Sequence, residues 1–254
     1  MLPFFIMTKT GVLSEVFDSI QGEGLLLGYR QLFLRFAGCN LSCRFCDTPL
    51  SPRAEGFKVY PVAGNDSEYY HQNPVNVPQL LAVIEKFDID NYHSLTITGG
   101  EPLLQDAFLS ELLPALGSLG WKIHLQTNGI CVDELVRVVD HLDWISMDYK
   151  LASVTGLIDF RQQHRKFFKI CPEKVLGVKM VVSREAQTEE IMAGAKELLG
   201  ISPDLTLILQ PVTPLKGVKA PQAQQLFNWH SQLIKLGVKR LRIIPQIHPV
   251  LNLL

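Results

Sequence analysis

The chain of 254 residues carries 24 Lys and Arg against 25 Asp and Glu, which gives a formal net charge of −1. Such a balanced charge does not indicate a nucleic-acid partner or an acidic tail. Hydrophobic residues make up 47% of the sequence, but no stretch reaches the roughly 18 apolar residues of a membrane span. The opening residues lack the basic start and long apolar run of a signal peptide. We therefore expect a cytoplasmic protein with neither nucleic acid nor membrane as partner.

Apolar runs that favour strands alternate with helical patterns along most of the chain. The expected strands cover residues 31–36, 94–98, 122–126, 144–148, 175–182, 205–210 and 240–244. The expected helices cover residues 77–87, 103–116, 132–141, 188–199 and 220–236. In the second of these helices, an apolar residue recurs at every fourth position, at Leu104, Phe108, Leu112 and Leu116, as one buried face requires.

This alternation predicts an α/β fold built from βαβ units around a parallel sheet. The strands are continuous apolar runs, as expected where both faces of a sheet are buried. Six or seven units suit a partial (β/α) barrel with about six parallel strands. Residues 49–78 differ, because they are rich in Pro, Asn, Tyr and Gly and have no clear period. We expect a long loop or insertion there, within a single domain that covers residues 1–254.

Three of the five cysteines lie within eight residues, directly after the expected strand that ends at Phe36. Cys39, Cys43 and Cys46 form a C-x3-C-x2-C array in a loop of the kind that carries chemistry in α/β barrels. The spacing favours a metal site over a disulfide framework. Fe–S clusters usually take four thiolates, and no fourth Cys lies nearby, so one iron would keep an open position. Zinc is the weaker alternative, because the nearest following histidine is His71.

This array resembles the signature of the radical S-adenosylmethionine enzymes. The resemblance implies a [4Fe–4S] cluster whose unique iron binds the amino and carboxylate groups of S-adenosylmethionine, which is then cleaved to a deoxyadenosyl radical. It also implies a cofactor contact at the TGGEP segment, through Gly100 and Glu101. Glycine there lets the backbone approach a neighbour closely, although an ordinary strand-to-helix turn would use the same residues.

Polar residues also end several expected strands, at the edge of a barrel where active sites lie. In the SMDYK segment, Ser146 and Lys150 are candidates for the ribose or carboxylate of S-adenosylmethionine, with Asp148 beside them. A structural ion pair is the alternative for Asp148 and Lys150. Gln210 is a candidate contact to the adenine or ribose, although a polar residue that ends a strand is as often a turn former.

A more specific resemblance includes the residues before the cysteines. The segments SIQGEG, RFAGCNLSCRFCDT, TITGGEP, LQPVTP and RIIPQIHPVL look like those of the 7-carboxy-7-deazaguanine synthase family. The resemblance implies a lyase of queuosine and 7-deazapurine biosynthesis that converts 6-carboxy-5,6,7,8-tetrahydropterin into 7-carboxy-7-deazaguanine with release of ammonia. It further implies Mg²⁺ as a cofactor, a low-potential electron donor such as flavodoxin or ferredoxin, and a homodimer.

The substrate contacts follow from the same resemblance. Ile20, Gln21, Gly22 and Glu23 would meet the pterin edge, which displays alternating donors and acceptors. Arg35 offers a planar fork that matches the substrate carboxylate.

Two threonines complete the expected site. Thr98 would contact the substrate, and Thr48 would bind Mg²⁺, which keeps waters and substrate oxygens as its other ligands. Hydroxyls that only stabilise turns are the alternative for both. We expect no catalytic acid, base or nucleophile among the side chains, because the cofactor supplies the difficult step.

Two other functions remain open at this point. A glycyl-radical-enzyme activase would share the cysteine array and TGGEP but would act on a protein, with no reason for SIQGEG. A non-catalytic Fe–S electron carrier would need four ligands and would not need TGGEP. Cys131 and Cys171 stand alone, and we expect them to be ordinary buried thiols.

Overall fold

The computed structural model describes residues 9–48, 54–61 and 69–251. Within them, one curved ten-stranded sheet forms the centre of the molecule, in the order β12-β11-β10-β9-β8-β7-β3-β2-β4-β5. The run from β3 to β12 is parallel throughout. Its seven strands are β3 (Arg30–Phe36), β7 (Ser94–Gly99), β8 (Ile123–Thr127), β9 (Trp144–Asp148), β10 (Val175–Val182), β11 (Thr206–Pro211) and β12 (Arg240–Ile243). The predicted α/β partial barrel is therefore confirmed.

Three more strands extend the sheet beyond β3, and two others lie apart from it; the sequence did not predict any of these five. β2 (Leu13–Ile20) pairs antiparallel with β3, β4 (Gly56–Tyr60) runs parallel to β2, and β5 (Tyr69–Gln72) runs antiparallel to β4. β1 (Thr10–Gly11) and β6 (Val75–Asn76) form a separate two-stranded ladder. The segment expected to be a loop or insertion thus contains strands in its described part. Its residues 49–53 and 62–68 lie outside the described residues.

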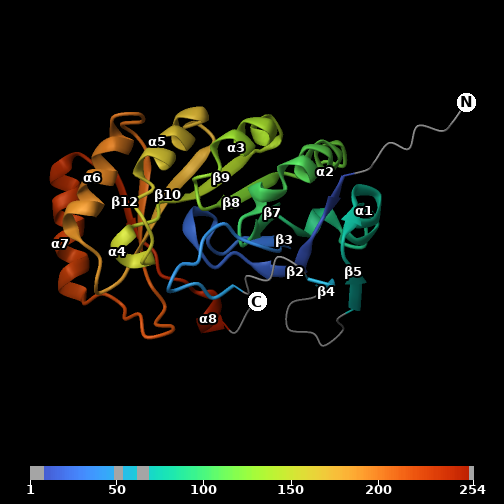
Figure 1. Ribbon diagram of the computed structural model, residues 1–254, viewed down its shortest axis with the longest axis horizontal. Coiled ribbons are helices and arrows are strands. Elements are labelled where there is room, and N and C mark those ends of the chain that lie inside the picture. Colours follow the sequence, from blue (N-terminus) through green and yellow to red (C-terminus); the bar gives the residue numbers. More distant parts are fainter. Residues whose placement is uncertain (1–8, 49–53, 62–68, 252–254) are drawn as a thin grey trace, which may run out of the picture.

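Helices cover the outer face of the curved sheet, as Figure 1 shows. They are α1 (Val77–Ile84), α2 (Asp106–Ser118), α3 (Val132–Val138), α5 (Arg161–Ile170), α6 (Thr188–Leu199) and α7 (Ala223–Leu236). Two short helices lie elsewhere: α4 (Ala152–Thr155) follows the carboxyl end of β9, and α8 (His248–Leu251) is near the C-terminal end of the described chain. Short 3-10 helices are η1 (Gly24–Leu26), η2 (Ile89–Asn91), η3 (Pro102–Gln105) and η4 (Val139–His141). The sequence did not predict α5, because its only buried residues are His164, Phe167 and Phe168 in an otherwise polar stretch.

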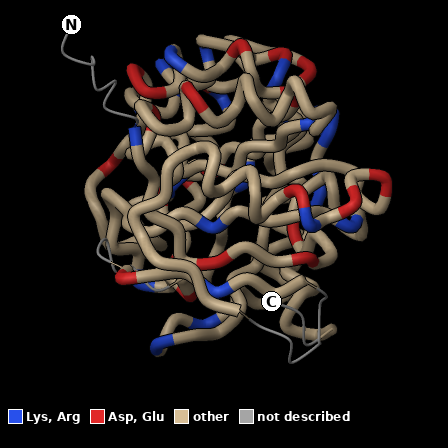
Figure 2. The backbone as a smooth tube through the Cα atoms, turned by 90° about the vertical axis from the view of Figure 1, so that its right-hand side faces the viewer, with Lys and Arg blue, Asp and Glu red and all other residues tan. Residues whose placement is uncertain are grey.

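The core lies between the sheet and these helices. Phe108, Leu112 and Leu116 of α2 are buried in it, as their spacing predicted. Leu104 is not, and its side chain is exposed because residues 102–105 form η3 rather than the first turn of α2. None of the helices in the described part of the chain is long and apolar enough to cross a membrane. Basic and acidic residues are interspersed along the backbone in the view of Figure 2.

Candidate functional site

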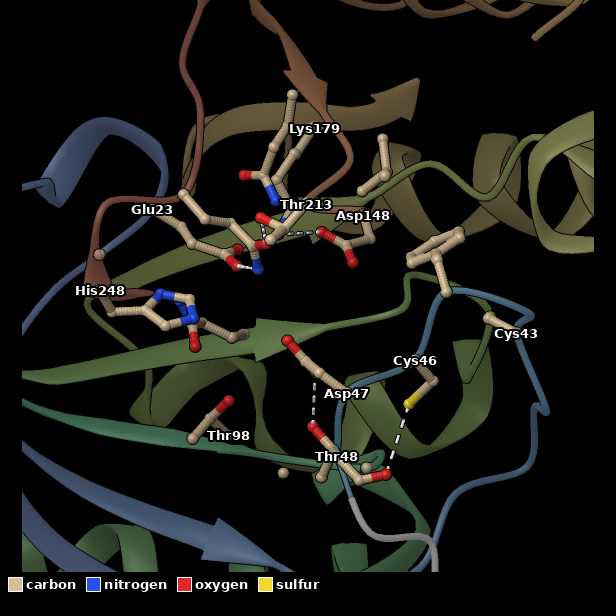
Figure 3. Close-up of a pocket in the computed structure, with 18 of the residues that line it drawn as sticks. Glu23, Cys43, Cys46, Asp47, Thr48, Thr98, Asp148, Lys179, Thr213 and His248 are labelled. Carbon is tan, nitrogen blue, oxygen red and sulfur yellow. Dashed lines mark hydrogen bonds and ion pairs between the residues drawn. The ribbon is translucent and has the colours of Figure 1, made fainter. Parts of the chain in front are cut away.

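The carboxyl ends of the parallel strands and the loops that follow them enclose a cavity of about 650 Å³. Figure 3 shows part of its lining. All but one of the residues singled out in the sequence line this cavity: Ile20, Gln21, Gly22, Glu23, Arg35, Cys39, Cys43, Cys46, Thr48, Thr98, Gly100, Ser146, Asp148, Lys150 and Gln210. They come from segments more than 180 positions apart, so the fold brings the predicted site together. Glu101 is the exception.

The glycines of TGGEP pack against the cysteine loop. A side chain at Gly100 would place its Cβ 2.1 Å from the carbonyl oxygen of Gly38 and 2.9 Å from the Cβ of Cys39. Gly99 has a φ of +136°, and a Cβ there would lie 2.1 Å from the carbonyl oxygen of Phe36. Only glycine allows this contact. The segment therefore positions the cysteines, in addition to lining the cavity at Gly100.

Glu101 turns away from the cavity and is completely buried. Its carboxylate accepts hydrogen bonds from the backbone N–H of Leu103 at 3.1 Å, the hydroxyl of Thr127 at 2.9 Å and the backbone N–H of Asn128 at 2.8 Å. Burial raises the pKa of Glu101 to about 7, while these donors oppose the rise. The observed role is to join the ends of β7 and β8, and a contact of Glu101 with the cofactor stays a prediction.

The three cysteine side chains of the loop face the same cavity. Burial raises the pKa values of Cys39 and Cys43, and the nearby charge of Lys150 opposes this. Among the described residues, no three His, Cys, Asp or Glu side chains are grouped to hold a single metal ion. A single zinc ion draws its ligands around one point. A four-iron cluster instead offers a separate iron to each thiolate.

Four charged side chains, which we call the ionic cluster, lie beside the cysteines: Glu23, Asp148, Lys150 and Lys179. Lys150 Nζ lies 2.6 Å from Asp148 Oδ2, and Lys179 Nζ lies 3.2 Å from Asp148 Oδ1 and also contacts Glu23. Figure 3 shows the side chains of Glu23, Asp148 and Lys179 turned toward one another. Burial would raise the pKa of Asp148, but the two lysines hold it below its ordinary value, and Lys179 lowers the pKa of Glu23 in the same way.

Lys179 was not predicted from the sequence. It lies in the middle of β10, in the run VLGVKMVV, and no motif includes it. The available signal was a single charge inside an apolar parallel strand, because such a charge must find a partner where the strand is covered on both faces. The ion pair expected as the alternative for Asp148 and Lys150 is present, and both residues nevertheless line the cavity.

The C-terminal segment closes over the SIQGEG strand end. Gln246 Nε2 donates to Glu23 Oε1 at 2.6 Å, and the backbone N–H of Ile247 donates to the carbonyl of Gly22 at 3.0 Å. A Cβ at Gly22 would lie 2.5 Å from the ring of His248, so this contact needs glycine. Gln246 and His248 both line the cavity.

Arg35 and Gln21 already have protein partners. Arg35 Nε donates to Glu15 Oε2 at 2.8 Å, and its guanidinium lies 5.0 Å from the centre of the Phe17 ring. The amide of Gln21 donates to Gln31 Oε1 at 2.8 Å and accepts from the backbone N–H of Glu23 at 3.1 Å. The two terminal nitrogens of Arg35 make no hydrogen bond to the residues that the structure describes, whereas the Gln21 side chain is held by the protein.

Two further predicted residues differ in their surroundings. Gln210 is buried, and its side-chain oxygen has no hydrogen-bond partner among the residues that the structure describes. Thr48 is partly exposed, and its hydroxyl donates to Asp47 Oδ1 at 3.3 Å. Asp47 lines the cavity as well. Gln210 thus presents an acceptor that needs a donor, and Thr48 lies beside a carboxylate that binds cations well.

Comparison with known proteins identifies the family of this chain. Residues 34–178 match the family model "Radical SAM superfamily". The chain is 38% identical over 249 residues to the 7-carboxy-7-deazaguanine synthase of Geobacter sulfurreducens, covering 95% of this chain and 98% of the relative. It is 32% identical over 260 residues to the enzyme of the same name from Thermococcus kodakarensis, with 96% and 99% covered.

Solved structures agree at the level of the fold. The crystal structure of QueE from Escherichia coli superposes with a TM-score of 0.60 at 21% identity, covering 93% of this chain and 94% of that one. Streptococcus suis SuiB bound to S-adenosylmethionine gives a TM-score of 0.55 at 16% identity, with 82% and 48% covered. These structures show the fold, and the more similar sequence relatives show the family. The chain belongs to the 7-carboxy-7-deazaguanine synthase family of the Radical SAM superfamily.

Proposed function

We propose that this protein converts 6-carboxy-5,6,7,8-tetrahydropterin into 7-carboxy-7-deazaguanine and releases ammonia, as a carbon–nitrogen lyase. The observation that carries the proposal is one cavity that joins the cysteine loop to the SIQGEG strand end, Arg35 and the ionic cluster. The full-length relatives named above are synthases, which favours a small-molecule substrate over the protein substrate of an activase.

The residues fit a [4Fe–4S] cluster and S-adenosylmethionine, the cofactors of the Radical SAM superfamily. Cys39, Cys43 and Cys46 would bind three irons and leave the fourth open for the cofactor. The unpartnered oxygen of Gln210 would accept a hydrogen bond from an N–H or O–H group of the cofactor. When bound, these groups supply the carbon radical that removes a hydrogen atom from the substrate.

The ionic cluster suits the methionine end of S-adenosylmethionine, which carries both an ammonium and a carboxylate. Asp148 and Lys150 present one charge of each sign on the cavity wall, 2.6 Å apart. When no ligand is bound, each of these two charges is compensated by the other. Ser146, at the same strand end, would bind the ribose, and Gly100 would let the cofactor lie close to the backbone.

The substrate would lie along the part of the cavity wall that the SIQGEG strand end and Arg35 form. The terminal nitrogens of Arg35 would bind the substrate carboxylate as a fork. Glu23, its pKa lowered by Lys179, is ionised at neutral pH and would accept from the pterin amino groups. Backbone groups of Ile20 and Gly22 would meet the rest of that edge, while the held amide of Gln21 orients the turn before Glu23.

Thr98 and Thr48 would complete the site, with Thr98 touching the substrate. We assign Mg²⁺ to Thr48, because a single protein oxygen suffices where waters and the substrate supply the other ligands. Thr48 lines the cavity and is oriented by its hydrogen bond to Asp47. Omitting Mg²⁺ is expected to slow turnover more strongly in the parent protein than in Thr48→Ala.

The proposal also covers the domain organisation, the electron donor and the oligomeric state. The continuous sheet supports a single domain across residues 1–254. A low-potential donor such as flavodoxin or ferredoxin would deliver the electron that the cluster needs, and the protein would work in the cytoplasm as a homodimer. Gel filtration with light scattering tests the last point, and a molar mass near twice 28.5 kDa is expected.

Anaerobic turnover tests the function. Reconstituted protein is mixed with dithionite, S-adenosylmethionine, Mg²⁺ and 6-carboxytetrahydropterin, and the product is identified by its ultraviolet spectrum and mass. We expect 7-carboxy-7-deazaguanine. Cleavage of S-adenosylmethionine to deoxyadenosine without any deazaguanine would leave the radical chemistry standing and show that the substrate is wrong.

A further inference from the structure

A row of buried polar side chains crosses five neighbouring strands beneath the cavity. It begins at Gln21, directly after β2, and continues through Gln31 on β3, Thr96 on β7 and His124 on β8 to Ser146 on β9. The first four side chains are at most 2% exposed. We call these five residues the buried polar chain. Only Gln21 and Ser146, its two ends, line the cavity.

The directions of the hydrogen bonds from Gln21 to Thr96 follow from one backbone group. The N–H of Glu23 can only donate, and it lies 3.1 Å from the side chain of Gln21, which must present its oxygen there. The amide nitrogen of Gln21 therefore donates to Gln31 at 2.8 Å, and Gln31 must accept this hydrogen bond with its side-chain oxygen. The nitrogen of Gln31 then points to the hydroxyl of Ser94 at 2.7 Å, which can accept.

The same reasoning fixes the next link. The hydroxyl of Thr96 lies 2.9 Å from the oxygen of Gln31, which is only an acceptor, so Thr96 must donate its single proton there. Thr96 can then only accept from the ring of His124, whose Nδ1 lies 3.3 Å away. Burial lowers the pKa of His124 to about 3, so the ring is neutral and carries one N–H. The contact with Thr96 is a hydrogen bond when that N–H is at Nδ1.

Ser146 is the last link. Its hydroxyl lies 2.8 Å from Nε2 of His124, and that nitrogen carries no proton when Nδ1 does. The proton of Ser146 is therefore directed into the protein, and its oxygen faces the cavity with lone pairs only. A hydroxyl on a surface can rotate to donate or accept a hydrogen bond, whereas the hydroxyl of Ser146 can only accept one from a ligand in the cavity.

We propose that Gln31, Thr96 and His124 are positioning residues that hold Ser146 as a hydrogen-bond acceptor, so that it selects a ligand with an O–H or N–H donor at that point. The ligand named here, a ribose hydroxyl of the adenosyl cofactor, rests on the proposed function; the polarity of Ser146 does not. A cofactor with that hydroxyl replaced by an ether would place two acceptors against each other, because neither oxygen has a proton to offer.

Nitrogen-15 NMR of histidine-labelled protein without cofactors tests the polarity directly. The chain contains seven histidines, and the His124 signal is assigned as the one lost in His124→Gln. We expect the Nδ1–H tautomer, unchanged from pH 6 to pH 8. The Nε2–H tautomer or an imidazolium in the unmodified protein would overturn the proposal, and this result is independent of whether the protein turns over any substrate.

Two variants of matched size sharpen the test. Thr96→Val removes the acceptor for Nδ1–H, so the ring is expected to shift to the Nε2–H tautomer, and the affinity for S-adenosylmethionine to fall about tenfold, the value of one lost hydrogen bond. Thr96→Ser keeps the hydroxyl and is expected to retain the Nδ1–H tautomer and the affinity. Equal tautomers in both variants would contradict the assigned chain. If Thr96→Val does not fold, the spectrum of the unmodified protein still decides.

Discussion

Two polar regions border the cavity, and they meet at Gln21 and Glu23. In the ionic cluster, Lys179 contacts Glu23 and Asp148 at once, so several charges share one cation. In the buried polar chain, the donor and acceptor roles of Gln21, Gln31 and Thr96 are determined, and the proposed tautomer of His124 sets the role of Ser146. The charged region can redistribute its contacts when a charged ligand arrives, whereas the neutral region can only present the pattern of donors and acceptors with which it folds.

The largest effect is expected when one of the cysteines beside the ionic cluster is replaced. Cys43→Ala is expected to reduce the iron content of reconstituted protein to background and to abolish turnover, because two thiolates remain for the cluster. The matched control is Cys131→Ala, whose thiol is buried in the core and contacts Asn40 at 3.5 Å. Its iron content should equal that of the parent. Equal iron loss in the two variants would refute the ligand assignment.

Breaking the ionic cluster itself should have the next largest effect. Lys179→Met leaves Glu23 and Asp148 without their shared cation, and we expect the free energy of unfolding to fall by about 3 kcal/mol in urea denaturation of the metal-free protein. Lys239→Met is the control, since Lys239 pairs with Asp204 at 3.1 Å with both side chains about two-thirds exposed. It should cost under about 1 kcal/mol. Similar losses would show that the cluster is as weak as a surface pair.

The two kinds of buried carboxylate should respond to pH in opposite directions. The pKa of Glu101 is raised from 4.5 to about 7, so the folded state holds a proton that the unfolded state releases, and stability should decline by roughly 3 kcal/mol as pH rises through this window. The pKa values of Asp148 and Glu23 are lowered, so their contribution is present at neutral pH and is lost as pH falls below the ordinary carboxyl range.

Urea denaturation between pH 3 and pH 8 separates these contributions. Glu101→Gln should flatten the decline toward neutral pH, and Asp148→Asn should flatten the loss on the acid side. The slope is compared, rather than the absolute stability, because Glu101→Gln also turns an amide nitrogen toward a backbone donor. Parallel pH profiles in the parent and Glu101→Gln proteins would contradict the raised pKa.

The parallel part of the sheet was predictable from the sequence, and so were fifteen residues of the cavity lining. β9 and β10 begin and end where the apolar runs do, because a strand covered on both faces must be apolar along its length. The antiparallel extension was not predictable in the same way. β4 and β5 are short, and β5 reads YYHQ, so their place depends on pairing with distant residues rather than on local pattern.

Some site residues were likewise predictable from the sequence and others were not. A motif marks a position in the chain, and so the cysteines and Arg35 were found, but a motif does not give the direction of a side chain. Glu101 lies within TGGEP and yet faces the protein interior. Lys179 and His124 belong to no motif, and only the packing of adjacent strands brings them to Asp148 and Ser146.

The smallest expected effect concerns Arg35, which lines the cavity and belongs to neither region. Arg35→Lys keeps the charge next to Glu15 but removes the fork, so the unfolding free energy should change by less than about 1 kcal/mol. The KM for 6-carboxytetrahydropterin should nevertheless rise about tenfold, because a lysine cannot bind a carboxylate through two parallel hydrogen bonds. Arg30→Lys is the matched control: Arg30 binds Asp18 through two bonds of 2.9 and 2.6 Å but does not line the cavity. If both variants shift KM alike, Arg35 acts through the sheet rather than on the substrate.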